Sequence, residues 1–126
     1  MINMESRIQF LKGYIKLLES MPLTNFEVKD IPEEPGLYAI YDENDVLIYI
    51  GQTSNLQRRL LRNHRSGNSR GSAFRRALMK DKEFENEKIM SSYIRNNCTF
   101  RYLPLQKELS AIEHFLIAVL EPKLNS

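Results

Sequence analysis

Apolar residues recur at three- and four-residue steps over residues 4–20, a spacing that predicts an amphipathic helix with one apolar stripe. The stripe consists of Met4, Ile8, Leu11, Ile15 and Leu18. Pro22 ends this pattern, and residues 24–35 are mostly polar and include Pro32 and Pro35. We therefore expect an N-terminal helix followed by a connector.

The next pattern is that of a β-hairpin. Leu37–Tyr41 and Val46–Ile50 are rich in β-branched and aromatic residues, and they flank the polar residues 42–45. Two such runs with a polar turn between them predict a pair of antiparallel strands.

A basic helix is predicted directly after the hairpin. Ser54, with Gln57 three residues later, has the spacing of a helix N-cap, and Gly67 is typical of a helix end. Three leucines of this helix are expected to face the core, namely Leu56, Leu60 and Leu61.

The remaining chain predicts helices around one further strand. Residues 72–80 are predicted to form a second helix. A charged stretch from Lys82 follows, and the sequence then has a further helical pattern that continues to Ile94. Cys98–Leu103 is a third strand, ended by Pro104, and Gln106–Leu120 is the last helix.

Length and composition indicate one globular domain in a reducing compartment. The 126 residues fit a single core, and 42% hydrophobic with 27% charged residues excludes a disordered chain. The longest nearly apolar stretch, Ala111–Leu120, contains Glu113 and His114 and is shorter than the roughly 20 residues of a membrane span. A single cysteine, Cys98, and no secretory signal favour the cytoplasm.

Positive charge is concentrated in one segment of the chain. Residues 52–80 carry eight Lys/Arg and no acidic residue, whereas residues 1–51 carry four Lys/Arg and nine acidic residues. Such a block indicates a polyanionic partner such as DNA, although a solvated charged face is the alternative. The candidate nucleic-acid contacts are Arg58, Arg62, Arg65, Arg70 and Arg75.

Two tyrosines occupy the predicted hairpin, Tyr38 near the start of its first strand and Tyr49 near the end of its second. Strand pairing would bring them close together. A phenolic hydroxyl can donate or accept a hydrogen bond. Next to a cation or metal it can lose its proton and act as a general base toward water. The alternative is that both rings only pack in the core.

Glu113 and Arg59 are the other candidate site residues. Glu113 is predicted on an apolar helical face together with Leu109, Ile112, Leu116 and Leu120. A partly buried carboxylate needs a partner, for which a divalent metal ion or an arginine is the usual choice. Arg59 lies one turn into the basic helix and could bind phosphate through its forked guanidinium, the alternative being a solvent-exposed side chain.

These residues form a pattern that resembles the GIY-YIG nuclease family. Gly36-Leu37-Tyr38 is followed after ten residues by Tyr49-Ile50-Gly51, then by Arg59, Glu113 and Asn125, and the resemblance covers about residues 33–126. It implies an α+β domain with a three-stranded antiparallel sheet flanked by helices. Residues 1–32 would add the N-terminal amphipathic helix and its connector.

The resemblance also implies a role for each residue of the pattern. Tyr38 would activate the attacking water, Tyr49 would orient the water or the phosphate, and Arg59 would stabilise charge on the scissile phosphate. Glu113 would bind one Mg²⁺ or Mn²⁺ ion. Structural roles near the site are implied for Gly36, Gly51 and Asn125.

His64 departs from the family's spacing. Many members carry His or Tyr four positions beyond the motif arginine, where this chain has Asn63, and His64 comes one residue later. On an α-helix one residue turns the side chain by about 100°. His64 would therefore assist catalysis only if the helix were locally irregular.

The resemblance implies a metal-dependent DNA endonuclease, a hydrolase of phosphodiester bonds. The alternative is a catalytically weak or inactive nucleic-acid-binding module on the same fold. Specificity would come from the chain's own loops, from a homodimer that the N-terminal helix could form, or from a partner protein.

Overall fold

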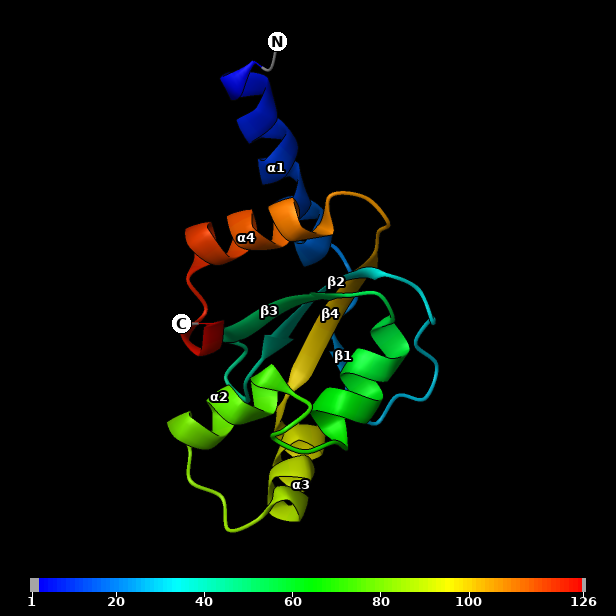
Figure 1. The fold of residues 1–126 in the computed structure, drawn as a ribbon, viewed down its shortest axis with the longest axis vertical. Coiled ribbons are helices and arrows are strands. Elements are labelled where there is room, and N and C mark those ends of the chain that lie inside the picture. The colour runs from blue at the N-terminus through cyan, green and yellow to red at the C-terminus, as the bar shows by residue number, and fades with distance from the viewer. Residues whose placement is uncertain (1–2, 126) are drawn as a thin grey trace.

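A four-stranded antiparallel sheet forms the centre of the protein in the computed structural model, which describes residues 3–125 (Figure 1). In the order β1-β4-β2-β3, the sheet contains β1 (Thr24–Asn25), β2 (Gly36–Tyr41), β3 (Leu47–Thr53) and β4 (Thr99–Pro104). Because β2, β3 and β4 are the three predicted strands, the predicted α+β class is confirmed. β1 is an addition, formed by two residues of the expected connector that pair with the start of β4.

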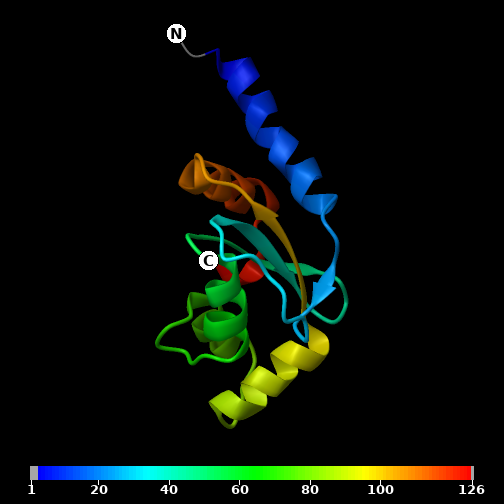
Figure 2. The ribbon, with the colours of Figure 1, turned by 90° about the vertical axis from the view of Figure 1, so that its right-hand side faces the viewer.

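Helices cover both faces of this sheet, as Figures 1 and 2 show. They are α1 (Met4–Glu19), the π-helix η1 (Arg58–Arg65), α2 (Ala73–Asp81), α3 (Glu87–Asn97), α4 (Leu109–Leu120) and the 3₁₀-helix η2 (Lys123–Asn125). α4 begins three residues later than predicted, because Glu108 has a left-handed backbone (φ 56°) that a helix interior does not accept. No helix in the part of the chain that the structure describes is long and apolar enough to cross a membrane.

The sheet is buried on both faces, which explains why the hairpin sequence is apolar almost throughout. Leu37 and Ala39 of β2 pack on the side of α1 and α4. Tyr38 and Ile40 alternate with them and pack on the side of η1, α2 and α3. Successive residues of β2 therefore belong to two separate cores, and Tyr38 faces the basic helix.

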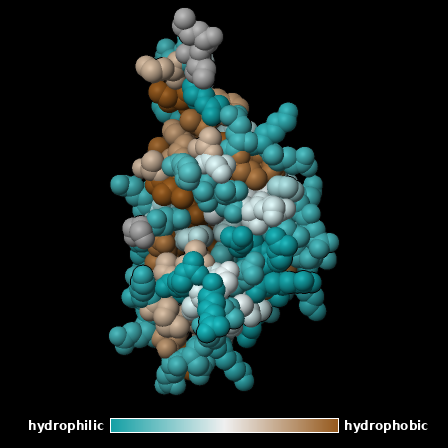
Figure 3. All heavy atoms as spheres, viewed as in Figure 1, coloured by the Kyte–Doolittle hydropathy of each residue, from teal (hydrophilic) through white to brown (hydrophobic). Residues whose placement is uncertain are grey.

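Only part of the predicted apolar stripe of α1 packs against the domain. Leu18 is buried, and Leu11 and Ile15 are partly buried against the core shared with α4. Met4 and Ile8 are exposed, and the N-terminal half of the helix extends beyond the body of the protein (Figure 2). Apolar residues are visible around α1 and α4 in Figure 3. The homodimer through this helix stays a prediction.

The basic helix starts one residue later than predicted and has a wider turn. Asn55, not Ser54, caps it, because the Asn55 Oδ1 atom accepts a hydrogen bond from the Arg58 backbone N–H at 3.0 Å. After Leu56 and Gln57 the backbone continues as a π-helix over Arg58–Arg65. Burial of the three leucines, at 0%, 0% and 6% exposure, confirms the predicted core face of Leu56, Leu60 and Leu61.

Candidate active site

The two motif tyrosines lie side by side on one face of the hairpin. Tyr38 on β2 is opposite Gly51 on β3, and Ile40 is opposite Tyr49, so the two tyrosines are diagonal neighbours. Their ring centroids are 6.3 Å apart. The expectation that strand pairing brings these phenols together is confirmed.

Gly51 leaves the space that the Tyr38 side chain fills. A Cβ atom added at Gly51 would overlap the Tyr38 hydroxyl group and ring. Because the ring of Tyr38 lies across the glycine backbone, the hydroxyl can reach the neighbouring helix η1. The motif glycine thus shapes the site by having no side chain.

We expect Gly51→Ala to destabilise the protein by about 1–3 kcal/mol, because the added methyl group overpacks the buried Tyr38. Urea unfolding of the purified variant measures this change. Gly71→Ala is the matched control, since a Cβ atom there meets no heavy atom within 4 Å. Equal stability of the two variants would contradict the packing argument.

His64 contacts Tyr38 directly, and the π-helix is the reason. The Tyr38 Oη and His64 Nε2 atoms are 2.6 Å apart. A π-helix bonds residue i to residue i+5, so Arg59 and His64, five residues apart, fall nearly one turn apart. The local irregularity that the sequence left open is therefore present, and it turns His64 toward the hairpin.

Ser72 completes a buried chain of polar groups that the sequence did not reveal. Its Oγ atom lies 2.6 Å from His64 Nδ1 and accepts a hydrogen bond from the Arg75 backbone N–H at 3.0 Å. Tyr38, His64 and Ser72 are at most 1% exposed. The sequence predicts the start of a helix here but contains no spacing that connects Ser72 with His64.

Burial keeps both members of the Tyr38–His64 pair neutral. Burial lowers the pKa of His64 to about 3, and the positive charges of Arg59 and Arg75 add to this effect. Burial, and then the neighbouring Tyr49, raise the pKa of Tyr38 well above its usual value, while Arg59 acts in the opposite direction.

The buried His64 makes stability depend on pH. Its pKa is lower in the folded chain (about 3) than the ordinary value of 6.5, so the unfolded chain binds one more proton between these values. We expect the His64 contribution to stability, complete above pH 6.5, to be lost by about 1.4 kcal/mol for each pH unit below it.

Chemical unfolding at several pH values measures this slope. His64→Gln should remove it, whereas His114→Gln should retain it, because the His114 side chain is 76% exposed. A slope that persists in His64→Gln would contradict the assignment.

Arg59 belongs to η1, on the tyrosine face of the sheet, whereas Glu113 belongs to α4, which packs on the opposite face. The Arg59 Nε atom is buried without a hydrogen-bond partner among the described residues. The Glu113 side chain is 18% exposed, and burial raises its pKa, against the smaller effects of His114, the Gln52 backbone and Arg59. The charges of Arg59 and Glu113 both act on the Tyr38 and Tyr49 hydroxyls: Arg59 lowers the pKa of each phenol, and Glu113 raises it.

The surroundings of Glu113 fit a single divalent cation. Within residues 3–125, Glu113 forms no ion pair with lysine or arginine, and its Oε1 atom lies 3.8 Å from Nε2 of the exposed His114. No group of three or more His, Cys, Asp or Glu side chains suited to a metal ion occurs in this part of the chain. Mg²⁺ commonly binds one or two carboxylates together with water and substrate phosphate, so Glu113 suffices as its protein ligand.

Asn125 fastens the strand that carries Tyr49. Its Oδ1 atom accepts a hydrogen bond from the Ile50 N–H, and its Nδ2 atom donates one to the Ile50 carbonyl, each at 2.8 Å. β3 is an edge strand, and the Asn125 amide satisfies its backbone where another strand would otherwise pair. Gly36, at the start of β2, lies so close to the Leu103 carbonyl that a Cβ atom would collide with it.

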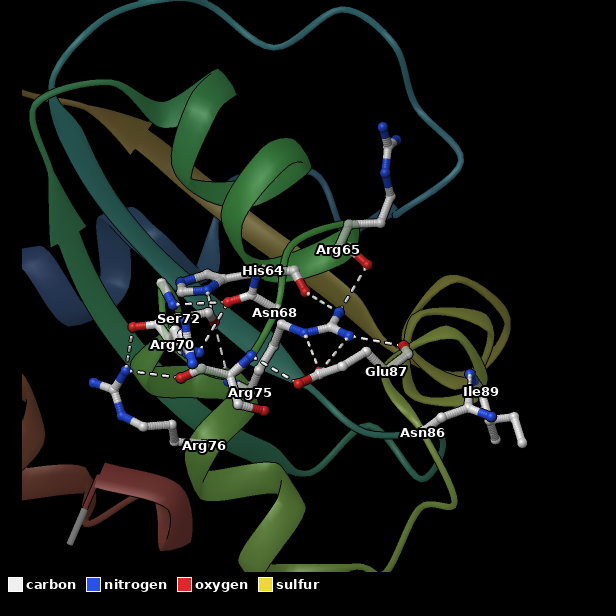
Figure 4. Close-up of polar contacts among 12 residues, drawn as sticks. His64, Arg65, Asn68, Arg70, Ser72, Arg75, Arg76, Asn86, Glu87 and Ile89 are labelled. Carbon is white, nitrogen blue, oxygen red and sulfur yellow. Dashed lines mark hydrogen bonds and ion pairs between the residues drawn. The ribbon is translucent and has the colours of Figure 1, made fainter.

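The structure corrects the prediction that Arg75 contacts nucleic acid. Its side chain is fully buried, and Figure 4 shows it between η1 and the start of α3. The guanidinium donates to the carbonyl groups of His64, Arg65 and Glu87 and forms an ion pair with the Glu87 carboxylate at 3.0 Å. Arg75 therefore joins three segments that are separate in the sequence.

The other four predicted contacts differ in their surroundings. Arg65 Nη1 donates to the carbonyl groups of Phe26 and Val28, and so ties η1 to the segment after β1. Arg58, Arg62 and Arg70 are exposed.

Similarity to known proteins covers most of the chain. A family model described as the GIY-YIG catalytic domain matches residues 20–126. The chain is 29% identical over 98 residues to UvrABC system protein C of Actinobacillus succinogenes. The matched region covers 78% of this chain and 14% of that protein. It is 29% identical over 96 residues to the same protein of Haemophilus influenzae, 76% of this chain and 13% of that protein. The chain thus spans less than a sixth of the length of these relatives.

Proposed function

Because the chain belongs to the GIY-YIG catalytic domain family, we propose that it is a metal-dependent endonuclease that hydrolyses phosphodiester bonds in DNA. The proposed catalytic unit spans residues 33–126, and the described part of residues 1–32, which begins at residue 3, packs on it through β1 and Leu18. The observation that supports this most is that the opposite charges of Arg59 and Glu113 both act on the adjacent Tyr38 and Tyr49 hydroxyls, while no ion pair joins Arg59 and Glu113 within residues 3–125. A cation and a phosphate group would complement these two opposite charges.

Arg59 and Glu113 would bind the two charged components of the reaction. Arg59 would hold a non-bridging phosphate oxygen, since its buried Nε has no other partner and its charge persists throughout the reaction. Glu113 would hold one Mg²⁺ or Mn²⁺ ion, which supplies Lewis-acid and leaving-group stabilisation when bound.

Tyr38 would take the proton of the attacking water. Its pKa in the free protein is too high for that task, but a cation held by Glu113 would lower it, so that the phenol would release its own proton to solvent and the phenolate would accept one from water. Tyr49, on the same face, would orient the water or the phosphate through its hydroxyl group.

His64 and Ser72 would stabilise the ionised form of Tyr38. The Ser72 oxygen already accepts from the Arg75 N–H, so its own hydrogen can be donated to His64 Nδ1. This places the imidazole hydrogen on Nε2, which then donates to the Tyr38 oxygen. A phenolate accepts such a hydrogen bond more strongly than a phenol does.

Incubation of the purified chain with supercoiled plasmid and with branched DNA tests the proposal. We expect cleavage with Mg²⁺ or Mn²⁺ and none after addition of EDTA. Salt-sensitive binding without any cleavage product would contradict it and would favour the alternative of a non-catalytic nucleic-acid-binding module.

A further inference from the structure

A cavity of about 460 Å³ opens directly beside the candidate active site, between α2 and the C-terminal segment. One of its lining residues is Tyr49. Ala73, Ala77 and Leu124 give the cavity an apolar wall, and the ring of Tyr49 adds an aromatic surface. Its size lies in the range of sites for small ligands, roughly 300–1,000 Å³.

The rim of this cavity carries an excess of positive charge. Arg76 and Lys80 lie one turn apart on α2, and both are exposed. The acidic residue in the lining, Asp81, forms an ion pair with Lys123 at 3.1 Å. Arg76 and Lys80 form no ion pair with any residue in the range 3–125.

Arg76 is held in place without losing its charge. Its Nη1 atom donates to the carbonyl groups of Ser69 and Arg70, each at 2.9 Å, as Figure 4 shows. Carbonyl groups are neutral, so the full charge remains available to an anion. Tyr49 lines the same cavity, so the Arg76 charge lies beside a residue of the candidate active site.

We infer that this cavity binds one unpaired nucleotide of the DNA strand, with its base against the apolar wall and Tyr49 and its phosphate on Arg76 and Lys80. A nucleotide combines a flat, stacking base with an anionic phosphate, which matches the two parts of the lining. A paired base stays stacked inside the duplex and cannot enter a concave pocket until it leaves the stack. The inference rests on the proposed function and adds a preference for DNA that is unpaired next to the cleaved bond.

Binding of two fluorescein-labelled duplexes, identical except for one unpaired thymidine, tests this inference. Anisotropy titrations in EDTA measure affinity without cleavage. We expect the full chain to bind the duplex with the unpaired nucleotide about tenfold more tightly. The double variant Arg76→Ala/Lys80→Ala should lose this preference, and its slope of log affinity against log salt should become shallower by about 2.

The matched control is Lys88→Ala/Arg95→Ala, which removes the same charge beside a different cavity, next to α3, that has no aromatic wall. This variant should keep both the preference and the salt slope. Equal binding of the two duplexes by the unmodified chain, or equal loss in both double variants, would overturn the inference. Because this assay contains no metal ion, a chain that shows the binding preference but cleaves neither plasmid nor branched DNA with Mg²⁺ or Mn²⁺ would refute the proposed function alone.

Discussion

Glu113→Gln is expected to lower the rate of DNA cleavage by about a thousandfold while the folded protein becomes no less stable. The loss follows from the proposed role of Glu113 as the protein ligand of the metal ion, whose stabilisation of the transition state amounts to several kcal/mol. The stability is preserved because Glu113 has no lysine or arginine partner within the described residues. Burial raises its pKa, which means that its negative charge opposes folding at neutral pH, and glutamine removes that charge.

Three measurements check this prediction: single-turnover cleavage, thermal unfolding without metal, and calorimetric titration with Mn²⁺. The variant should show no Mn²⁺ binding where the unmodified chain does. Glu121→Gln, an exposed acid at the end of the same helix, is the control and should behave like the unmodified chain. Full cleavage by Glu113→Gln would remove Glu113 from the mechanism, and a large loss of stability would indicate that it has a structural partner instead.

Tyr38→Phe is expected to reduce cleavage by about 10²–10⁴-fold, the range typical of the removal of a general base. Unlike Glu113→Gln, it should also destabilise the fold, by about 1–3 kcal/mol, because the buried His64 Nε2 atom loses its partner. The two variants should thus be distinguishable by their unfolding curves even if both are inactive.

Tyr102→Phe provides the control for Tyr38→Phe. Tyr102 on β4 is the direct neighbour of Tyr38 across the sheet, but it is only partly buried. Cleavage rates of the two variants should differ by at least about a hundredfold in favour of Tyr102→Phe. Similar rates would show that the Tyr38 hydroxyl has no special part in the reaction.

The sequence predicted the hairpin half of the site well because strand pairing is a local geometric rule. Once two apolar runs flank a polar turn, residues near the start of one strand and the end of the other must meet, as Tyr38 and Tyr49 do. The partial burial of Glu113 could also be predicted from the sequence, because the 3.6-residue period of a helix fixes the apolar face on which Glu113 lies.

The helical half of the site was less predictable because it depends on contacts between distant segments. Leu56, Leu60 and Leu61 fit an ordinary α-helix as well as the π-helix that is present, so their pattern does not reveal the wider turn. Arg75 looks like any surface arginine in the sequence. Its burial becomes evident only when two segments distant in the sequence, η1 and the start of α3, bring their carbonyl groups to it.

The wide turn of η1 has a consequence for how residues of this family are aligned. Because one extra residue is absorbed within the helix, the imidazole still meets the phenol, and the interval counted along the chain understates how closely two sites correspond in space. We therefore expect His64 to correspond in space to the residue that lies four positions beyond the motif arginine in other members, although it comes five positions after Arg59 in this chain.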